Sequence, residues 1–307
     1  MNENERYLLR HVCDGNMERA QSQARVILEG IKTQKDESFR NHMLEKLDAK
    51  KAKIVELPSN IKGLIIAENV SDFPVERFLI REAEEKIVTD TLNLYHVAEQ
   101  LKDLSIPYLP ALMLHGQSGC GKTMLARYIA YKTNLPFVYV NFSNLVGQYL
   151  GNTQSNIGRI FDYVREHPCV LCFDEIDAVG MARGQKNDVG EMNRIVIALM
   201  QEMDRLPNNL IIIGTTNRYD RLDPALIRRF SIEHEVRPLT VEEAKTLARS
   251  FLASVNINRN WFEDWFEDWF EKTFCHIVPA SDLIREATKM VVQAIIAQRE
   301  GFEKNEE

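Results

Sequence analysis

Four short apolar runs recur along the middle of the chain and alternate with segments of helical period. They read ALMLHG, FVYVNF, VLCFDE and LIIIGTTN and lie between residues 111 and 217. Short apolar runs bounded by turn residues are typical of strands. Strands that alternate with helices form a mostly parallel sheet covered by helices on both faces. The sequence therefore predicts an α/β domain, which we assign to residues 63–239.

Helical periodicity dominates the two ends of the chain. Residues 1–62 are predicted to form a helical N-terminal region that closes with the turn-rich run DAKKAKIVELPSN. An amphipathic helix is expected from Phe78 to Leu101, and residues 240–307 are expected to form a small C-terminal helical domain. The positions that define these helical faces are Ala20, Ala24, Ile27 and Ile31, then Phe39, Met43 and Leu47, and finally Ile80, Ala83, Ile87, Leu94, Val97 and Leu101.

The composition limits the kinds of partner that the chain is expected to have. Its 307 residues carry a net charge of −7, so the chain has no general attraction for nucleic acid or anionic membranes. No apolar run approaches the roughly 18 to 20 residues that span a bilayer. The five cysteines argue against a disulfide framework and favour a cytoplasmic protein. Cys169 and Cys172 are expected to be small hydrophobic residues of a buried strand.

A glycine-rich run, GQSGCGKT at residues 116–123, follows the first apolar run and opens the helical pattern TMLARYIAY. It satisfies G-x-x-x-x-G-K-[ST], in which backbone N–H groups wrap phosphates at a helix N-terminus. Lys122 is expected to reach the β- and γ-phosphates of a nucleotide, and the Thr123 hydroxyl is expected to hold Mg²⁺. The predicted nucleotide-binding residues are Gly116, Gln117, Ser118, Gly119, Cys120, Gly121, Lys122, Thr123 and Met124.

Polar residues follow two further apolar runs. Asp174 and Glu175 are adjacent carboxylates at the end of a buried strand, where they repel each other and lose hydration. Their position makes sense if Asp174 faces Mg²⁺ and Glu175 faces the water that attacks the γ-phosphate. Asn217 follows LIIIGTT, where an amide can hold that water or the γ-phosphate without adding charge. Asp177 is expected to be a helix cap or a supporting group.

Two adjacent arginines, Arg228 and Arg229, come just after the helical turn that Pro224 opens in LDPALIRRF. An arginine can stabilise charge on a nucleotide that a neighbouring subunit holds. Because Lys122 already serves the chain's own site, action on a neighbour is the expected role. A pair of ordinary surface arginines is the alternative.

The segments GQSGCGKT, VLCFDEID, GTTN and LDPALIRRF stand in the order and spacing of the AAA+ ATPases. The chain resembles the AAA branch, which includes protein unfoldases and remodelling enzymes, over about residues 105–300. The resemblance implies a P-loop domain with a five-stranded parallel sheet flanked by helices, a small C-terminal helical lid and a homo-oligomeric ring, usually a hexamer, with ATP between subunits. No N-K-x-D motif stands downstream, so ATP is expected rather than GTP.

The sequence departs from the family pattern at two places. The family usually separates its two interface arginines, whereas Arg228 and Arg229 are adjacent, so either one can be the residue that reaches the neighbouring site. In the lid segment PASDLIREATKM, Arg285 is an unexpected basic residue. It is either a sensor of the nucleotide or an ordinary exposed arginine. Arg194 is a candidate for the subunit interface or for a surface ion pair.

Tyr149, Leu150 and Gly151 lie in the largely polar stretch SNLVGQYLGN. The family carries an aromatic-aliphatic-glycine triplet here, on a loop that projects into the central channel of the ring. Such side chains grip an extended polypeptide through non-directional contacts, and the glycine leaves the loop free to move. The resemblance therefore implies a polypeptide substrate, with packing of Tyr149 at a helix start as the alternative. Residues 181–191 are the expected second channel-facing segment.

A four-residue unit is written three times in WFEDWFEDWFEK, residues 261–272. In a helix, a step of four residues brings the tryptophans to neighbouring positions with the phenylalanines beside them. We interpret the repeat as a helix whose aromatic side fills the core of the lid. A partly exposed strip that docks a neighbouring subunit or an adaptor is the alternative.

The expected function is that of an ATPase that pulls polypeptides into a central pore, with Lys122, Glu175, Asn217, Arg228 and Arg229 as the catalytic set. The run HEVRP begins like the zinc-protease motif H-E-x-x-H but ends in proline, so degradation would need a partner. Residues 1–62 are the candidate region for recognising substrate or an adaptor. Two alternatives remain, a DNA-associated AAA+ ATPase of the helicase-loader or transposition-regulator type and a nucleotide-switched assembly scaffold. The net charge and the Tyr-Leu-Gly triplet argue against nucleic acid.

Overall fold

The structure is a computed structural model that describes residues 57–106, 108–148, 152–178, 188–255 and 262–303, and isolated positions between residues 6 and 40. The chain divides into two units, Met1–Val55 and Glu56–Glu307. Most of the predicted N-terminal helical region lies outside the described residues, and the positions described at 6, 8, 9, 24 and 26–28 are helical. The domain boundaries at residues 62 and 239 stay predictions. The second unit contains the sheet and the C-terminal helices.

A six-stranded sheet in the order β1-β3-β4-β5-β2-β6 forms the centre of the second unit. Five strands run parallel, as predicted, and they are β2 (Ala111–His115), β3 (Phe137–Asn141), β4 (Val170–Asp174), β5 (Ile211–Thr216) and β6 (Ile232–Glu235). Strands β2, β4 and β5 are buried almost throughout, which explains their continuous apolar sequences. Because β2 pairs with β5, the glycine-rich run after β2 and the polar residues after β5 come out at the same edge of the sheet.

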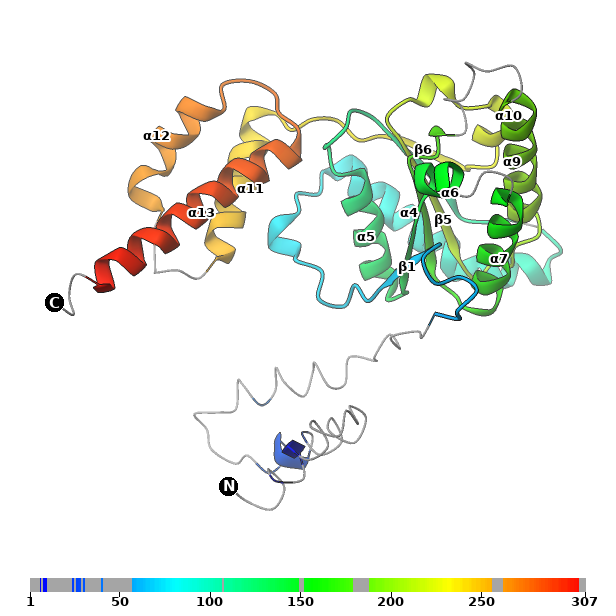
Figure 1. The fold of residues 1–307 in the computed structure, drawn as a ribbon, viewed down its shortest axis with the longest axis horizontal. Helices are drawn as coiled ribbons and strands as arrows, with labels where there is room; N and C mark the ends of the chain where they lie inside the picture. Colours follow the sequence, from blue (N-terminus) through cyan, green and yellow to red (C-terminus); the bar gives the residue numbers. More distant parts are fainter. Residues whose placement is uncertain are drawn as a thin grey trace. The chain divides into compact units, whose positions relative to one another are not determined.

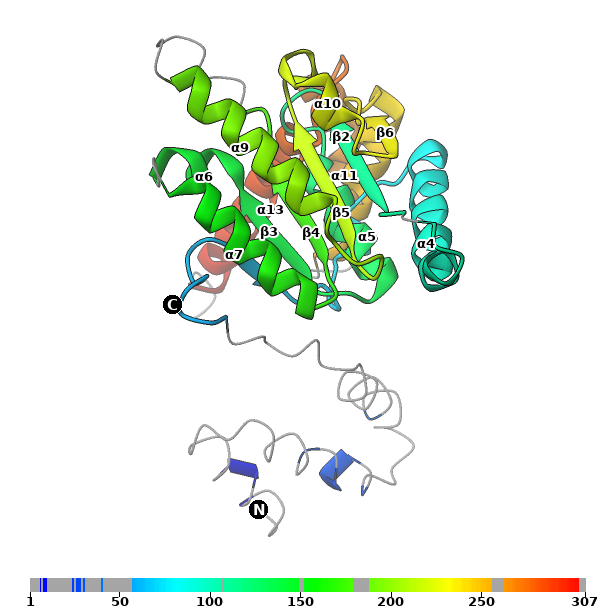
Figure 2. The same ribbon diagram turned by 90° about the vertical axis from the view of Figure 1, so that its right-hand side faces the viewer.

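Helices cover both faces of the sheet (Figures 1 and 2). Helix α5 (Lys122–Thr133) lies on one face, with α4 (Glu82–Asp103) packed against it near the β6 edge, and α6 (Phe142–Gln148), α7 (Thr153–Glu166) and α9 (Asp188–Met203) lie on the other face. The short elements η3 (Tyr219–Arg221) and α10 (Pro224–Ile227) connect β5 to β6. Leu125 and Ile129 of α5 pack on the sheet in one hydrophobic core with Leu112 and Ile213. The predicted α/β class is confirmed.

The edge strand β1 (Ile66–Glu68) pairs antiparallel with β3 and was not predicted from the sequence. Its three residues, IAE, are too few to show a period of two above their surroundings. A bidentate ion pair ties the strand to α5, because Arg127 donates to the two carboxylate oxygens of Glu68 at 2.7 and 3.1 Å. The complete sheet is therefore mixed, with the predicted parallel sheet as its larger part.

The helix that was predicted to start at Phe78 starts at Glu82, so the predicted boundary was wrong by about one turn. The Glu84 carboxylate accepts a hydrogen bond from the Arg81 backbone N–H at 3.0 Å. This is the contact that a glutamate in the third helical position makes with the residue that caps the helix. Residues 78–81 are thereby left outside the helix, where their side chains are available for other contacts.

The buried face of α4 also differs from the predicted one. Ala83 and Val97 are exposed, and the buried positions include two polar residues, Glu84 and Thr91. Each polar side chain has a partner that offsets its lost hydration. Glu84 pairs with Arg81, and the Thr91 hydroxyl donates to the carbonyl of Ile87 at 2.7 Å. Hydrophobic periodicity could not identify this face because polar residues occupy half of it.

Helices follow β6, as predicted; the described residues contain three, and Figure 1 shows them as a group beside the α/β domain. They are α11 (Val241–Ser254), α12 (Glu263–Thr273) and α13 (Ala280–Glu303). The repeat supplies the centre of their hydrophobic core, because Phe262, Phe266 and Phe270 are at most 6% exposed. Trp265 and Trp269 pack against the same core and are partly buried, while Trp261 lies outside the described residues. The interpretation of the repeat as lid core is confirmed.

Two further expectations concern the chain as a whole. Cys169 and Cys172 are buried at 1% and 0% exposure, as expected for small hydrophobic residues of β4 and its approach. Within the described ranges, none of the helices is both long enough and apolar enough to cross a membrane.

The phenylalanine core makes a prediction about the stability of the lid. Phe266→Ala removes a ring that is 0% exposed and should lower the free energy of unfolding of the lid by about 3 to 5 kcal/mol. The chain has three tryptophans, all in the repeat, so denaturant unfolding followed by tryptophan fluorescence reports on the lid. Glu271→Ala on the exposed side of the same helix is the control and should change little. Equal effects of the two substitutions would contradict the assignment of the core.

Candidate nucleotide site

The glycine-rich run forms a loop whose shape only glycine permits at two positions. Gly116 has φ +134°, and a Cβ there would lie 2.3 Å from the carbonyl oxygen of Val236. Gly119 has φ +79°, and a Cβ there would lie 2.2 Å from the hydroxyl of Ser281 in the lid. The backbone N–H of Ser281 also donates to the Gly119 carbonyl at 3.0 Å. The loop thus lies in close contact with the residue after β6 and with the first turn of α13.

The Lys122 side chain occupies the inside of this loop. The residue is 7% exposed, and its ammonium donates to the carbonyls of Gly116 at 3.0 Å and Gln117 at 2.9 Å. A third bond, of 2.6 Å, goes to the side-chain oxygen of Asn217 just after β5. Burial lowers the pKa of Lys122, and the negative charges of nearby groups, Asp174 among them, act against that shift. The loop therefore presents a cation whose hydrogen bonds fix it at the carboxyl edge of the sheet.

Asp174 is the last residue of β4, and three hydroxyl groups lie within hydrogen-bond distance of its carboxylate. The Thr123 hydroxyl is 3.5 Å from Oδ1, and the Thr215 hydroxyl of β5 also donates to Oδ1. The Tyr139 hydroxyl of β3 donates to Oδ2 at 2.9 Å. Burial raises the pKa of Tyr139 to about 12, so this hydroxyl keeps its proton at neutral pH. Neither Tyr139 nor Thr215 was identified from the sequence.

Glu175 adopts a backbone conformation that is rare for its residue type. Its φ is +56°, in the left-handed region that costs a residue with a Cβ about 1 to 2 kcal/mol. The turn is held by hydrogen bonds on both sides, from the Ile176 N–H to the Thr215 carbonyl and from the Ala178 N–H to the Glu175 carbonyl. The Glu175 side chain is exposed. Asp177 is buried and accepts from the Thr216 hydroxyl at 2.7 Å, so it supports the ends of β4 and β5.

A cavity of about 780 Å³ connects these side chains with the lid. The predicted residues on its wall are Ser118, Gly119, Cys120, Gly121, Lys122, Thr123, Met124, Asp174, Glu175 and Asn217. Apolar residues from outside the predicted site complete the wall, among them Phe78 and Leu79 before α4, Phe251 of α11 and Ile284 of α13. Cys120 is 6% exposed, and burial raises the pKa of its thiol, in keeping with a space-filling role. The cavity thus combines a cationic, polar end with an apolar end.

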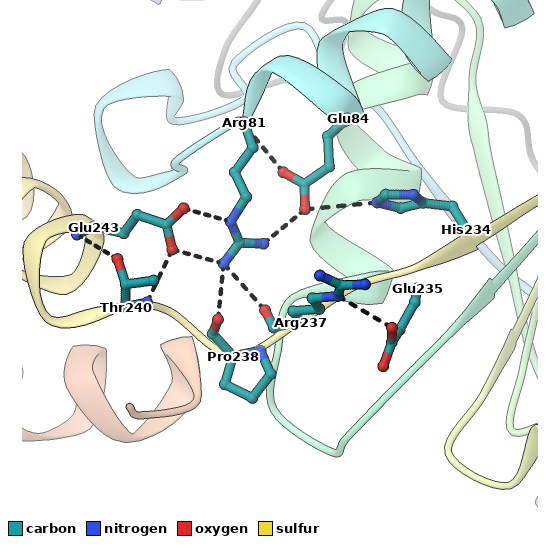
Figure 3. A network of polar contacts seen from close by, with 8 residues as sticks. All are labelled: Arg81, Glu84, His234, Glu235, Arg237, Pro238, Thr240 and Glu243. Atoms are coloured by element: carbon teal, nitrogen blue, oxygen red, sulfur yellow. Dashed lines mark hydrogen bonds and ion pairs between the residues drawn. The ribbon is translucent and has the colours of Figure 1, made fainter. Parts of the chain in front are cut away.

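Arg81 joins the α/β domain to the lid at the side of this cavity (Figure 3). Its guanidinium donates to Glu84 of α4 at 2.9 Å and to both carboxylate oxygens of Glu243 in α11 at 2.9 and 3.1 Å. It also donates to the carbonyls of Arg237 and Pro238, both at 3.1 Å, in the connection between β6 and α11. The hydrogen bond from Arg81 lowers the pKa of Glu243.

Glu243 is also the third residue of a capping box with Thr240, which starts α11. One carboxylate therefore begins the first helix of the lid and anchors that helix to Arg81. On the other side of Arg81, Glu84 is only 3% exposed, and His234 Nε2 lies 3.9 Å from its Oε1. The sequence carried no signal for this network because its members come from three separate segments.

The two adjacent arginines differ in their surroundings. Arg229 is held within the chain, since its guanidinium donates to both carboxylate oxygens of Asp204 at 3.4 and 3.2 Å and to the Ala225 carbonyl at 3.1 Å. The Arg228 side chain is exposed, and its guanidinium has no hydrogen-bond or ion-pair partner among the residues that the structure describes. Neither arginine lines the cavity. The structure therefore does not bring them into the chain's own site.

The remaining candidate residues either do not line the cavity or lie outside the residues that the structure describes. Tyr149, Leu150 and Gly151 lie outside the described residues, as does most of the second channel-facing segment. Arg285 is exposed and pairs with Asp282 at 3.2 Å and Glu286 at 3.6 Å on its own helix, and it does not line the cavity. Arg194 is exposed on α9.

Comparison with known proteins identifies one matching family and several similar proteins. Residues 112–238 match the model of the ATPase family associated with various cellular activities (AAA). The chain is similar to the 26S proteasome regulatory subunit 8 homolog of Schizosaccharomyces pombe, with 30% identity over 215 residues, which are 66% of this chain and 53% of that protein. It is similar to the proteasome-activating nucleotidase of Methanosphaerula palustris, with 33% identity over 218 residues, which are 67% of this chain and 53% of that protein.

A third relative is the peroxisomal ATPase PEX6 of Arabidopsis thaliana, with 36% identity over 146 residues, which are 46% of this chain and 16% of that protein. The chain thus spans about half the length of the two proteasomal relatives and less of the peroxisomal one. The family match takes in β2 to β6, and with them the glycine-rich loop, Asp174, Glu175, Asn217 and both adjacent arginines.

The Arg81 network yields a prediction about stability. Arg81→Ala leaves the buried Glu84 carboxylate without its main partner and should lower the free energy of unfolding by about 3 kcal/mol. Adding Glu84→Gln should recover part of that loss, because it removes the uncompensated charge. Both changes are measured by urea unfolding followed by circular dichroism.

Arg237→Ala is the matched control for Arg81→Ala. Arg237 belongs to the same region, but its side chain is 75% exposed and pairs with the exposed Glu235, so the change should cost less than about 1 kcal/mol. If the double variant Arg81→Ala/Glu84→Gln is as unstable as Arg81→Ala alone, the uncompensated charge of Glu84 is not the cause of the loss.

Proposed function

We propose that this chain, a member of the AAA ATPase family, hydrolyses ATP and uses the energy to remodel polypeptide substrates. The observation that carries the proposal is the convergence of Lys122, Asp174, Glu175 and Asn217 on one cavity beside the glycine-rich loop. A cation at the N-terminus of α5, two carboxylates at the end of β4 and an amide after β5 are groups that serve phosphoryl transfer from a nucleotide. The cavity volume of about 780 Å³ suits a ligand of the size of ATP.

The residues on the wall of the cavity fit Mg²⁺ as well as a nucleotide. Thr123 Oγ1 and Asp174 Oδ1 lie 3.5 Å apart, and hydroxyl and carboxylate oxygens are ligands that Mg²⁺ accepts. When bound, Mg²⁺ would neutralise part of the negative charge on the phosphates. Thr123 and Asp174 are the residues that would hold it.

Each remaining side chain has a role that follows from its position. Lys122 is held by the loop carbonyls and Asn217, so its charge is fixed at the glycine-rich loop before a nucleotide binds, and it would exchange one of these three acceptors for a phosphate oxygen. Glu175 is exposed at a strained turn and is the carboxylate that can accept a proton from the attacking water. Asn217 connects the end of β5 to Lys122 and is the amide that would contact the same γ-phosphate.

We assign the action on a neighbouring subunit to Arg228. Arg229 is held within the chain by Asp204, whereas the exposed Arg228 guanidinium is available for a phosphate on another subunit. An arginine in this role stabilises the charge of the transition state. The assignment requires a closed homo-oligomer in which the interface is head-to-tail, and a hexameric ring meets that requirement.

The substrate class rests on the relatives and on the sequence. Two of the relatives are named as proteasomal proteins, which supports a polypeptide as the substrate. Tyr149, Leu150 and Gly151 are the residues that we propose contact it in the channel of the ring. Residues 1–62 are the proposed region for binding an adaptor.

The proposed substrate class predicts a loss of coupling in Tyr149→Ala. In the wild type, a permanently unfolded carboxymethylated protein should stimulate the ATPase rate. Without the aromatic contact, the polypeptide concentration for half-maximal stimulation should rise about tenfold or more, since a buried aromatic side chain contributes about 1.5 to 3 kcal/mol. The ATPase rate without polypeptide should not change.

Tyr149→Phe keeps the aromatic ring and serves as the control, with stimulation close to that of the wild type. Stimulation by DNA alone, with no dependence on Tyr149, would instead support a DNA-associated ATPase. Slow turnover that neither polypeptide nor DNA changes would support a nucleotide-switched scaffold.

The assignment of Arg228 predicts complementation between two inactive variants. Lys122→Ala disables a subunit's own site but leaves its Arg228, and Arg228→Ala leaves the subunit's own site intact. Mixed rings should recover about a quarter of the wild-type ATPase rate, because a quarter of random neighbours pair in the productive order. An Arg228→Ala variant that is active by itself, together with an inactive Arg229→Ala variant that Lys122→Ala rescues, would transfer the role to Arg229.

A further inference from the structure

The Asp174 carboxylate is held from both sides by strands that flank β4. In the sheet, β4 lies between β3 and β5, and each neighbour contributes one hydroxyl donor. The Tyr139 hydroxyl of β3 donates to Oδ2 at 2.9 Å, and the Thr215 hydroxyl of β5 donates to Oδ1. A carboxylate with one donor on each oxygen cannot rotate freely about its Cβ–Cγ bond, since either bond would be lost. The two hydroxyls therefore set the plane of the Asp174 carboxylate.

The Tyr139 ring belongs to a series of contacts that reaches the edge of the sheet. The Arg127 guanidinium lies over the neighbouring Phe137 ring at 5.1 Å and over the Tyr139 ring at 6.0 Å. Arg127 in turn is held by its bidentate pair with Glu68 of β1. The unpredicted edge strand thus orients the arginine that packs against the tyrosine. An ordered series of contacts runs from β1 through α5 and β3 to the carboxyl end of β4.

We infer that Tyr139, together with Thr215, is a positioning residue that orients the Asp174 carboxylate toward Mg²⁺ in the nucleotide-bound protein. The inference rests on the proposed function, because Asp174 faces a metal only if the cavity takes up Mg²⁺ with its nucleotide. Donors behind a ligating carboxylate typically change metal affinity or activity by about 10- to 100-fold when they are removed. Neither residue lines the cavity, so neither can act by touching the nucleotide.

The test separates a role toward the metal from a general loss of structure. The probe is a fluorescent β,γ-imido analogue of ATP, whose dissociation constant is measured in EDTA and again in excess Mg²⁺. In the wild type, Mg²⁺ should tighten binding. In Tyr139→Phe, the constant in EDTA should equal that of the wild type, while the tightening by Mg²⁺ should be about tenfold smaller. Damage to the fold would weaken binding in both buffers alike.

Thr215 provides an independent pair of variants on the other side of the carboxylate. Thr215→Val removes the hydroxyl at nearly constant volume and should reduce the tightening by Mg²⁺, whereas Thr215→Ser keeps a hydroxyl and should preserve it. Tyr163→Phe is the control for loss of a tyrosine hydroxyl elsewhere, because Tyr163 lies on α7 and stacks on His167. Circular dichroism shows whether each variant is folded, and if Tyr139→Phe is not, the Thr215 pair decides.

The outcomes distinguish the inference from the function on which it rests. Normal tightening by Mg²⁺ in both Tyr139→Phe and Thr215→Val would overturn the inference and leave the proposed function intact. A wild type that binds the analogue equally well with and without Mg²⁺ would overturn the metal-dependent function and the inference with it. Reduced tightening in the two hydroxyl-deletion variants, with normal values for Thr215→Ser and Tyr163→Phe, supports the inference.

Discussion

The buried ammonium of Lys122 is the constraint on which the rest of the site depends. A cation that is 7% exposed needs several acceptors, and here they are the carbonyls of Gly116 and Gln117 and the side chain of Asn217. The first two require the tight loop after β2, and the third requires β5 to be the neighbour of β2. Lys122 therefore has all three acceptors only when the sheet order, the shape of the loop and the position of Asn217 occur together.

The second dependence is that between the loop and the lid. Ser281 at the start of α13 lies against Gly119, where a Cβ would come 2.2 Å from the Ser281 hydroxyl, and Arg81 fastens the first turn of α11 to the α/β domain. The cavity lies between these two attachments, with charged residues at the loop and apolar residues along the lid. A shift of the lid would therefore change the cavity wall and the surroundings of the phosphate loop at once. This is the physical link through which nucleotide state and lid position can influence each other.

Much of the fold and the polar part of the site could be predicted from sequence, and the misses have identifiable causes. The apolar runs and the glycine-rich loop are local patterns, so the parallel strands and the residues at their ends were found. The start of α4 was missed because a single capping contact, from the Arg81 N–H to Glu84, ends the extended segment before it. Strand β1 was missed because it is short and is held by a distant arginine, Arg127. Hydrophobic periodicity contains neither kind of information.

The sequence by itself determined which residues are candidates for binding and hydrolysing a nucleotide, because the glycine spacing, the paired carboxylates and the adjacent arginines are local sequence patterns. Only the tertiary structure decided which other residues they contact. It showed that Arg229 is tied to Asp204 while Arg228 is free of such a partner within the described chain, and that Tyr139 points at Asp174. These distinctions depend on contacts between segments far apart in the chain. Strand register and helix packing set such contacts, and no local pattern of residues encodes them.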